Sequence, residues 1–323
     1  MAISWSTYHL RLHQRLLREP LLLPPGAQLL LAVSGGQDSM ALTALMLDLQ
    51  RLHHWQLQLW HGNHCWRQES EQQAEALAAW AKSKNLKIQI DSWANPLHTE
   101  AAAREWRYGC LEQRAKTQDC RIVLTAHTAN DRSETLLLHL ARGSHRRGLG
   151  SLMAQRQLCQ GIQLVRPLLN FSRADTARIC ETLSIPIWLD PSNTDQRFSR
   201  NRIRNEVLPV LEQLHPGATQ RMAATAEGFS AEQESYGELL DLALKALQAD
   251  DSKIQRKKLM ALSIPCRGQL LQHWLLQQGL AAMGATQIKQ LWPQLETNRG
   301  PNQMVLAKGK TLEWDRLHIW LNS

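Results

Sequence analysis

The sequence predicts an α/β protein whose core is a doubly wound, mostly parallel, five-stranded sheet. Short apolar segments alternate with helix-forming segments over the first half of the chain, which is typical of parallel strands joined by helical crossovers. Polar residues gather directly after three of the apolar segments, at residues 34–39, 61–67 and 125–134. Because ligands of doubly wound sheets bind beyond the carboxyl ends of the strands, we expect these clusters to converge on one crevice.

The first strand and the helix after it are the clearest elements of this pattern. Residues 29–33 have the length and apolar content of a strand buried on both faces. Apolar residues from Met40 to Leu49 recur at helical spacing, so the next helix packs back on the sheet. The other expected strands are 55–60, 86–90, 121–125 and a segment ending at 166–169; the other expected helices are 4–19, 69–84, one that begins at Thr99, one from Thr128 or Asn130 to Leu140, and 173–183.

The second half of the chain predicts a long helix and a smaller domain. Pro209 and the pair Pro216-Gly217 mark a boundary, after which residues 218–249 contain few turn signals. We expect an α/β domain over residues 1–216, a helical linker over 217–250 and a small C-terminal α+β domain over 251–323. That last domain is expected to hold a helix at 269–280 and two short strands at 303–307 and 317–321.

Composition limits the classes of protein to which the chain can belong. With 323 residues, 43% of them hydrophobic, it is long enough for two domains, and its net charge of +8 favours a polyanionic partner. Its six cysteines form no C-x-x-C pair, which argues against a zinc ribbon or a cysteine-ligated cluster. No apolar segment reaches 18 residues, so we expect a cytoplasmic protein. Twelve tryptophans stand against three tyrosines and three phenylalanines, for which the sequence alone offers no functional account.

The turn between the first strand and its helix, Ser34 to Ser39, predicts an anion site. Gly35 and Gly36 allow a tight turn without a Cβ, and the helix then begins with unpaired N–H groups and the positive end of its dipole. The turn has no P-loop lysine and no G-x-G-x-x-G pattern. Instead Asp38 and the two serines surround the glycines, which suits a phosphate and its Mg²⁺. A Gly-Gly turn that binds nothing is the simpler alternative.

Ordered motifs add a family resemblance to this reading. SGGQDS resembles the loop of the PP-loop ATP pyrophosphatases, which cleave ATP between its α and β phosphates. Later segments resemble, in order, the H-x-N-H-x-x-R, E-A-x-A-R-x-x-R-Y and following motifs of tRNA(Ile)-lysidine synthetases. These segments are HGNHCWR, TEAAAREWRY, LTAHTANDRSETLLLHLARGS, and RPLL followed by DPSNTDQRFSRNRIRNEVLP. The resemblance spans residues 27 to 212 and implies a PP-loop, HUP-like fold.

The resemblance implies that lysine is ligated to the wobble cytidine of the tRNA(Ile) with a CAU anticodon, through an adenylated cytidine. ATP would be cleaved to AMP and diphosphate by the first domain, and the small C-terminal domain would recognise the tRNA. The implied residues are Ser34, Gly35, Gly36, Gln37, Asp38, Ser39 and His61 for ATP; Asp38 for Mg²⁺; Arg104 for the adenylate phosphate; Asp131 and Glu134 for L-lysine; and Arg146, Arg147, Arg197, Arg200, Arg202 and Arg204 for tRNA. Asp38, Arg104 and Asp131 would be catalytic, whereas His64 and Arg67 are as well explained by structural roles.

The chain departs from the family pattern at three neighbouring positions. Thr128 stands for a histidine, Asn130 for an aspartate and Arg132 for a glutamine, so a role that needs two carboxylates there is in doubt. No acidic residue lies between Glu134 and Asp175, whereas six arginines do, which favours RNA but also fits a solvated basic loop.

Alternatives stay open at this point: another PP-loop enzyme that adenylates a carbonyl of a tRNA base, a small-molecule amidating enzyme, or a tRNA-binding protein without activity. A homodimer is compatible with the sequence, although no segment predicts its interface.

Overall fold

The computed structural model describes residues 5–66, 69–97, 99–144, 146–150, 152–188, 199–250, 253–281, 283–297, 301–306 and 309–322. The chain forms two compact units, residues 1–230 and 231–323. The division falls inside the long helix α10 (Ala218–Leu247), which the sequence predicts at 218–249. The domain boundaries predicted at residues 216 and 250 stay a prediction. Among the described residues, no helix is both long and apolar enough to span a membrane.

The first unit is built on a six-stranded sheet of order β3-β2-β1-β4-β6-β5. Its strands are β1 (Gln28–Ala32), β2 (Gln56–Asn63), β3 (Lys87–Ser92), β4 (Ile122–Leu124), β5 (Gln155–Cys159) and β6 (Ile162–Val165). All neighbours are parallel except the β5–β6 hairpin. The mostly parallel sheet is therefore confirmed, with one strand more than predicted. Edge strand β5 escaped the prediction because its residues are only half-buried or exposed, so it lacks an apolar run.

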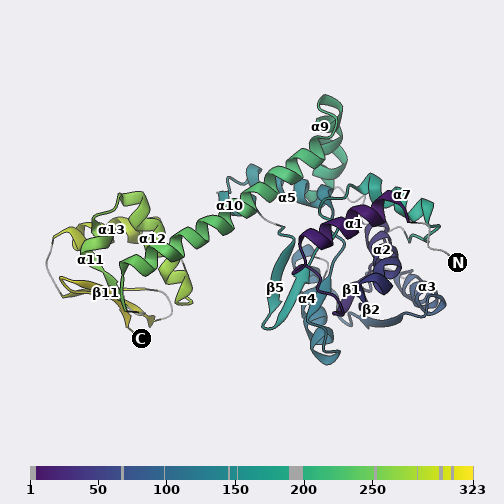
Figure 1. The fold of residues 1–323 in the computed structure, drawn as a ribbon, viewed down its shortest axis with the longest axis horizontal. Helices are drawn as coiled ribbons and strands as arrows, with labels where there is room; N and C mark the ends of the chain where they lie inside the picture. Colours follow the sequence, from purple (N-terminus) through teal and green to yellow (C-terminus); the bar gives the residue numbers. More distant parts are fainter. Residues whose placement is uncertain are drawn as a thin grey trace. The chain divides into compact units, whose positions relative to one another are not determined.

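Both faces of this sheet are buried, as the continuous apolar strands predict. Leu29 and Leu31 of β1 point into one hydrophobic cluster and Leu30 points into another. The first cluster contains residues of α2 (Gln37–His53) and α3 (Ser70–Ser83), and the second contains residues of α4 (Glu100–Thr117). Helices α2 and α3 therefore cover one face of the sheet and α4 the other (Figure 1).

The other helices of the first unit are α1 (Thr7–Arg18), α5 (Ala129–Ala141), α6 (Arg146–Leu149), α7 (Arg173–Thr182), α8 (Ser199–Arg202) and α9 (Leu208–Leu214). The three longest of them follow the expected segments closely, whereas α6 falls in a segment for which no helix was expected. Thr99 caps α4 by accepting the N–H of Ala102, as predicted. A π-helical turn, Ile203–Val207, joins α8 to α9. The sequence also predicts a helix from about Arg202, and the structure begins this helix three residues earlier, at Ser199.

The second unit is an α+β domain with its own core. Its antiparallel sheet has the order β7-β8-β11-β10-β9. The elements are β7 (Gln248–Asp250), β8 (Lys253–Gln255), α11 (Arg256–Met260), α12 (Ile264–Gln277), α13 (Ala285–Glu296), β9 (Asn302–Val305), β10 (Thr311–Trp314) and β11 (His318–Asn322). Trp274 and Trp314 are fully buried in this core. The sequence predicted only two of the five strands, because strands of three or four residues carry too little periodicity.

Candidate active site

The turn from Ser34 to Ser39 joins β1 to α2 and has a fixed shape. Gly35 has a φ of +83°, a left-handed conformation that favours glycine, and a Cβ there would lie 3.3 Å from the ring of Trp188. The Oγ of Ser39 accepts the N–H of Ser34 (3.2 Å) and donates to the carbonyl of Gly36 (2.8 Å). Since α2 begins at Gln37, the turn presents helix N–H groups and the exposed Ser34 hydroxyl to a ligand.

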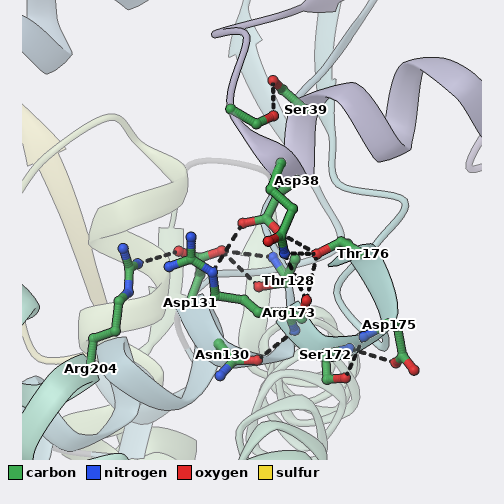
Figure 2. Close-up of polar contacts among 12 residues, drawn as sticks. Asp38, Ser39, Thr128, Asn130, Asp131, Ser172, Arg173, Asp175, Thr176 and Arg204 are labelled. Atoms are coloured by element: carbon green, nitrogen blue, oxygen red, sulfur yellow. Dashed lines mark hydrogen bonds and ion pairs between the residues drawn. The ribbon is translucent and has the colours of Figure 1, made fainter. Parts of the chain in front are cut away.

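Asp38 stands in the first turn of α2 and is held from α7. The Thr176 hydroxyl donates to its Oδ1 over 2.5 Å, and the Nε of Arg173 lies 3.6 Å from its Oδ2. The side chains of Asp38, Thr176 and Arg173 point toward one another (Figure 2). Burial raises the pKa of Asp38 above its ordinary value and outweighs the opposing effects of Arg173 and Thr176. Nearby Asp131 raises it further, so a cation at this carboxylate would be favoured.

Asp131 lies at the beginning of α5, after β4. Its Oδ2 accepts the N–H of Thr128 (2.8 Å), so it closes the first turn of the helix. Its Oδ1 lies 3.4 Å from Arg200 and 3.3 Å from Arg204. Burial alone would raise the pKa of Asp131, but His127, the two arginines and the Thr128 N–H outweigh burial and hold the pKa below its ordinary value. Asp131 is therefore an ionised carboxylate near Asp38.

Glu134, one turn further along α5, is fully buried. Arg200 donates to its Oε2 (2.8 Å), while Arg204 donates to Oε1 (2.6 Å) and Oε2 (2.9 Å). The L-lysine contact predicted for Glu134 does not fit this arrangement. Both carboxylate oxygens of Glu134 accept hydrogen bonds from arginines, and none of its side chain is exposed. The tRNA contacts predicted for Arg200 and Arg204 meet the same difficulty, since both guanidinium groups are committed to carboxylates.

Two histidines near the turn are held neutral. His61 of β2 is buried and its Nδ1–H donates to the carbonyl of Val33 (2.8 Å); burial lowers the pKa of His61. It therefore supports the end of β1, and a contact with ATP stays a prediction. His127 contacts the Thr125 hydroxyl (3.0 Å), and burial lowers its pKa to about 3. A neutral His127 adds no positive charge beside Asp131 at neutral pH.

Arg104, predicted to be catalytic, lies on the exposed surface of α4. Its guanidinium carbon is 5.1 Å from the ring centroid of Tyr108, and that of Arg156 is 4.9 Å from it. Burial would raise the pKa of Tyr108, but Arg104, Arg166 and Arg156 lower it. None of the contacts among the described residues joins Arg104 to Asp38 or Asp131, so its role in catalysis stays a prediction.

The remaining predicted residues are only partly described. Arg202 is exposed and forms an ion pair with Glu206 (3.1 Å). Arg146 and Arg147 begin α6, although their side chains are not described. Arg197 and Arg67 lie outside the described residues. His64 is half-buried among aromatic rings.

The three departures from the family pattern each have a local explanation. The N–H of Thr128 is bound by Asp131, and the Oδ1 of Asn130 accepts the N–H of Arg173 (3.0 Å). Arg132 is buried and pairs with Glu227 (3.2 Å). Asn130 therefore ties α5 to the start of α7, which is the helix that holds Asp38.

Arg173 and Thr176 are the site residues that sequence reasoning missed. Ser172 and Asp175 form a capping box at the start of α7, which places both residues in the first two turns of that helix. That signal was readable, since Ser172 and Asp175 stand three residues apart before an apolar stretch. The contact of Thr176 with Asp38 was not readable, because the two residues are 138 positions apart.

Comparisons with known proteins agree on family and fold. Residues 9–211 match the family described as PP-loop domain, and residues 255–319 match the TilS substrate binding domain. The tRNA(Ile)-lysidine synthase of Parasynechococcus marenigrum is 50% identical over 319 residues, covering 97% of this chain and 94% of that protein. The tRNA(Ile)-lysidine synthase of Prochlorococcus marinus strain SARG is 42% identical over 325 residues, covering 98% and 96%. The solved structure of a U34-tRNA thiolase from Methanococcus maripaludis has a TM-score of 0.58 at 14% identity, over 69% of this chain and 79% of that one, which shows a shared fold alone.

Proposed function

This chain belongs to the tRNA(Ile)-lysidine synthase family, and we propose that it ligates L-lysine to the wobble cytidine of the tRNA(Ile) with a CAU anticodon. ATP is cleaved to AMP and diphosphate in the process, and the tRNA changes from methionine to isoleucine specificity. The observation that carries this proposal is the pair of carboxylates, Asp38 and Asp131, beside a glycine turn that ends in a helix N-terminus. A phosphate, a cation and an amine can all be bound by these groups.

The turn suits the triphosphate of ATP by the chemistry of its donors. Gly35 and Gly36 carry no Cβ, and the N–H groups at the start of α2 with the hydroxyl of Ser34 are donors to phosphate oxygens. The Ser39 hydroxyl supports the turn, because it already donates to the carbonyl of Gly36. Gln37 is engaged elsewhere, because its amide donates to Thr176 (2.8 Å) and to the carbonyl of Arg173 (2.7 Å). We therefore assign Gln37 a supporting role in the loop.

Mg²⁺ fits a site with a single carboxylate such as Asp38. Among the described residues, no group of three or more histidine, cysteine, aspartate or glutamate side chains is arranged to hold a metal. Mg²⁺ is commonly bound by one or two carboxylates together with substrate phosphates, so Asp38 and the ATP oxygens form a suitable set. When bound, the ion neutralises charge on the phosphates as diphosphate departs.

The lysine step depends on Asp131. The ε-amine has an ordinary pKa of about 10.4 and must lose a proton before it attacks the adenylated cytidine. Asp131 is ionised and 15% exposed, and its Oδ1 meets Arg200 and Arg204 only at 3.4 and 3.3 Å. Unlike the fully buried Glu134, it can therefore still attract the ammonium group and orient it. Glu134 supports Asp131 indirectly, because it binds the two arginines that flank Asp131.

The nucleic-acid contacts rest on charge and on the second unit. The net charge of +8 and the segment from residue 135 to 174, which has no acidic residue, favour an RNA phosphate backbone. We assign this contact to Arg146, Arg147, Arg197 and Arg202, with the domain at 255–319 contributing to recognition of the tRNA. A homodimer stays a prediction that sedimentation of the purified chain will test.

Labelled lysine tests the proposal. Purified protein with ATP, Mg²⁺ and radiolabelled lysine is expected to place label on the isoleucine tRNA with the CAU anticodon and not on initiator tRNA. Label on both tRNAs, or label without tRNA, would rule the assignment out. AMP released with tRNA but without lysine transfer would favour another PP-loop enzyme that adenylates a base carbonyl.

A further inference from the structure

Three of the twelve tryptophans gather with a histidine at the carboxyl end of β2 and β3. His64 and Trp66 follow β2, Trp93 follows β3, and Trp106 lies on α4. We call these four residues the aromatic platform. The rings of Trp93 and Trp106 are stacked, with centroids 5.3 Å apart and planes 7° from parallel. The ring of His64 lies 5.0 Å from Trp106, 5.3 Å from Trp66 and 6.1 Å from Trp93.

The backbone of β2 and β3 is shaped to hold the platform. The N–H of Trp93 donates to the carbonyl of Asn63 (2.9 Å), which continues the β2–β3 pairing past the end of both strands. A Cβ on Gly62 would lie 2.5 Å from the ring of Trp60 and 3.0 Å from that of Trp106. Glycine at position 62 therefore lets Trp106 lie directly against the strand.

The platform is not part of the hydrophobic core. Among the described residues, Trp66, Trp93 and Trp106 are members of neither hydrophobic cluster of the first unit, and Trp106 meets the second cluster only at Trp60, whose ring centroid is 6.4 Å away. All four platform residues are half-buried in the described structure. Large aromatic rings left half-exposed at the ligand-binding edge of a sheet are suited to stacking on a flat partner.

Charge and position indicate what that partner is. Arg107 follows Trp106 on α4 and is exposed, and the combination of aromatic rings with a neighbouring arginine is typical of sites for unpaired nucleotides. The platform lies on the α4 face of the sheet, whereas the turn proposed for the triphosphate leads into α2 on the opposite face. A base of the RNA that reacts with the ATP therefore approaches from the α4 side of the sheet.

We propose that the aromatic platform stacks an unpaired base of the anticodon loop and so positions the wobble cytidine; this rests on the proposed function. Positions 62, 66 and 106 are ones that the motifs H-x-N-H-x-x-R and E-A-x-A-R-x-x-R-Y leave open. The platform therefore combines the motif residue His64 with tryptophans at positions that the motifs leave open, and it acts as a positioning device. Stacking tolerates any base identity, so the platform contributes affinity and position while other groups select the cytidine.

Affinity for RNA tests the platform separately from catalysis. The Kd of a transcript of the CAU-anticodon isoleucine tRNA is measured by fluorescence anisotropy in buffer without ATP or lysine. Trp106→Leu, which keeps an apolar side chain, is expected to raise this Kd about tenfold, and Trp106→Phe less than about threefold. Trp5→Leu is the matched control, because Trp5 is 45% exposed and lies outside the platform; its Kd is expected to equal that of the wild type.

A second measurement identifies the stacked partner and guards against misfolding. Anticodon hairpins, each lacking one base of the loop, compete with the tRNA for binding. At one loop position, loss of the base is expected to weaken binding of the hairpin to the wild type but not to Trp106→Leu. If Trp106→Leu proves unstable, Trp66→Leu replaces it and is expected to raise the Kd for the tRNA by a similar factor.

The proposal is overturned if both leucine variants bind the tRNA within twofold of wild type, or if the wild type does not bind it. It is also overturned if the leucine variants raise the KM for ATP instead, because adenine would then be the stacked base. Platform-dependent binding without lysine transfer would instead contradict only the proposed function.

Discussion

Two carboxylates of the first unit, Asp38 and Glu134, show how the same chemical group is left partly exposed or built into the scaffold. Asp38 is 21% exposed, accepts one hydroxyl and has one guanidinium at 3.6 Å. Glu134 is 0% exposed and accepts three hydrogen bonds from two arginines. A carboxylate whose oxygens are filled by the protein has no room for a ligand, whereas one that is incompletely neutralised still favours a cation. The difference assigns Asp38 to the ligand and Glu134 to the scaffold.

The largest effect is expected when the available carboxylate loses its charge. Asp38→Asn is expected to lower the rate of AMP formation roughly a thousandfold, because stabilising the departing diphosphate through a metal is worth several kcal/mol. Its affinity for tRNA and its Tm are expected to stay close to wild type, since asparagine can still accept the Thr176 hydroxyl. Rates are measured from labelled ATP, and a parallel loss of tRNA affinity would indicate a folding defect instead.

Removing the charge of Glu134 is expected to act on stability. Glu134→Gln leaves the guanidinium groups of Arg200 and Arg204 with one charged partner, Asp131, and breaking such a buried pair costs about 3 kcal/mol. For a unit of this size the Tm falls by about 6–12 °C, as measured by calorimetry. Glu206→Gln is the control, because its pair with Arg202 is exposed. Equal Tm values for the two variants would contradict the structural role of Glu134.

A smaller effect is expected from the hydroxyl that holds Asp38. Thr176→Val removes a hydrogen bond that lowers the pKa of Asp38. The pKa therefore rises further, and the KM for Mg·ATP increases about fivefold because the carboxylate loses the hydroxyl that orients it. The acid limb of the pH profile of kcat/KM is expected to move to higher pH. An unchanged acid limb would remove Asp38 as the group that titrates there.

The smallest effect concerns pH and His127. Its pKa is about 3 in the folded protein and 6.5 as the ordinary value, so the unfolded chain binds more protons between these values. The stability contributed by neutral His127 is therefore complete above pH 6.5 and is lost as the pH falls toward 3. Between pH 8 and pH 5 the Tm of His127→Gln is expected to fall by less than the Tm of the wild type. Identical slopes for the two proteins would show that His127 is not responsible.

The sequence predicted the regular parts of the fold because they carry strong local signals. The apolar run before Ser34, the periodic residues of α2 and the Thr99 cap each act within a few positions. Strand β5 and three strands of the second unit, β7, β8 and β10, were not predicted and are held by pairing with their neighbours.

The candidate site divides in the same way. The SGGQDS turn was readable from the sequence, and so was Asp131 at the start of α5. The burial of Glu134 was not readable, because it depends on arginines 66 and 70 positions away. The same holds for Arg200 and Arg204, whose clustered charges suggested RNA contacts although their partners lie on α5.

The stoichiometry of the modified tRNA tests the account most directly. Isoleucine tRNA with a CAU anticodon is incubated with the protein, ATP, Mg²⁺ and lysine, digested to nucleosides and examined by mass spectrometry while AMP is counted. We expect cytidine at the wobble position to carry one lysine, with one AMP formed for each lysine attached. An unchanged wobble cytidine, or modification accompanied by ADP and inorganic phosphate, would contradict the account.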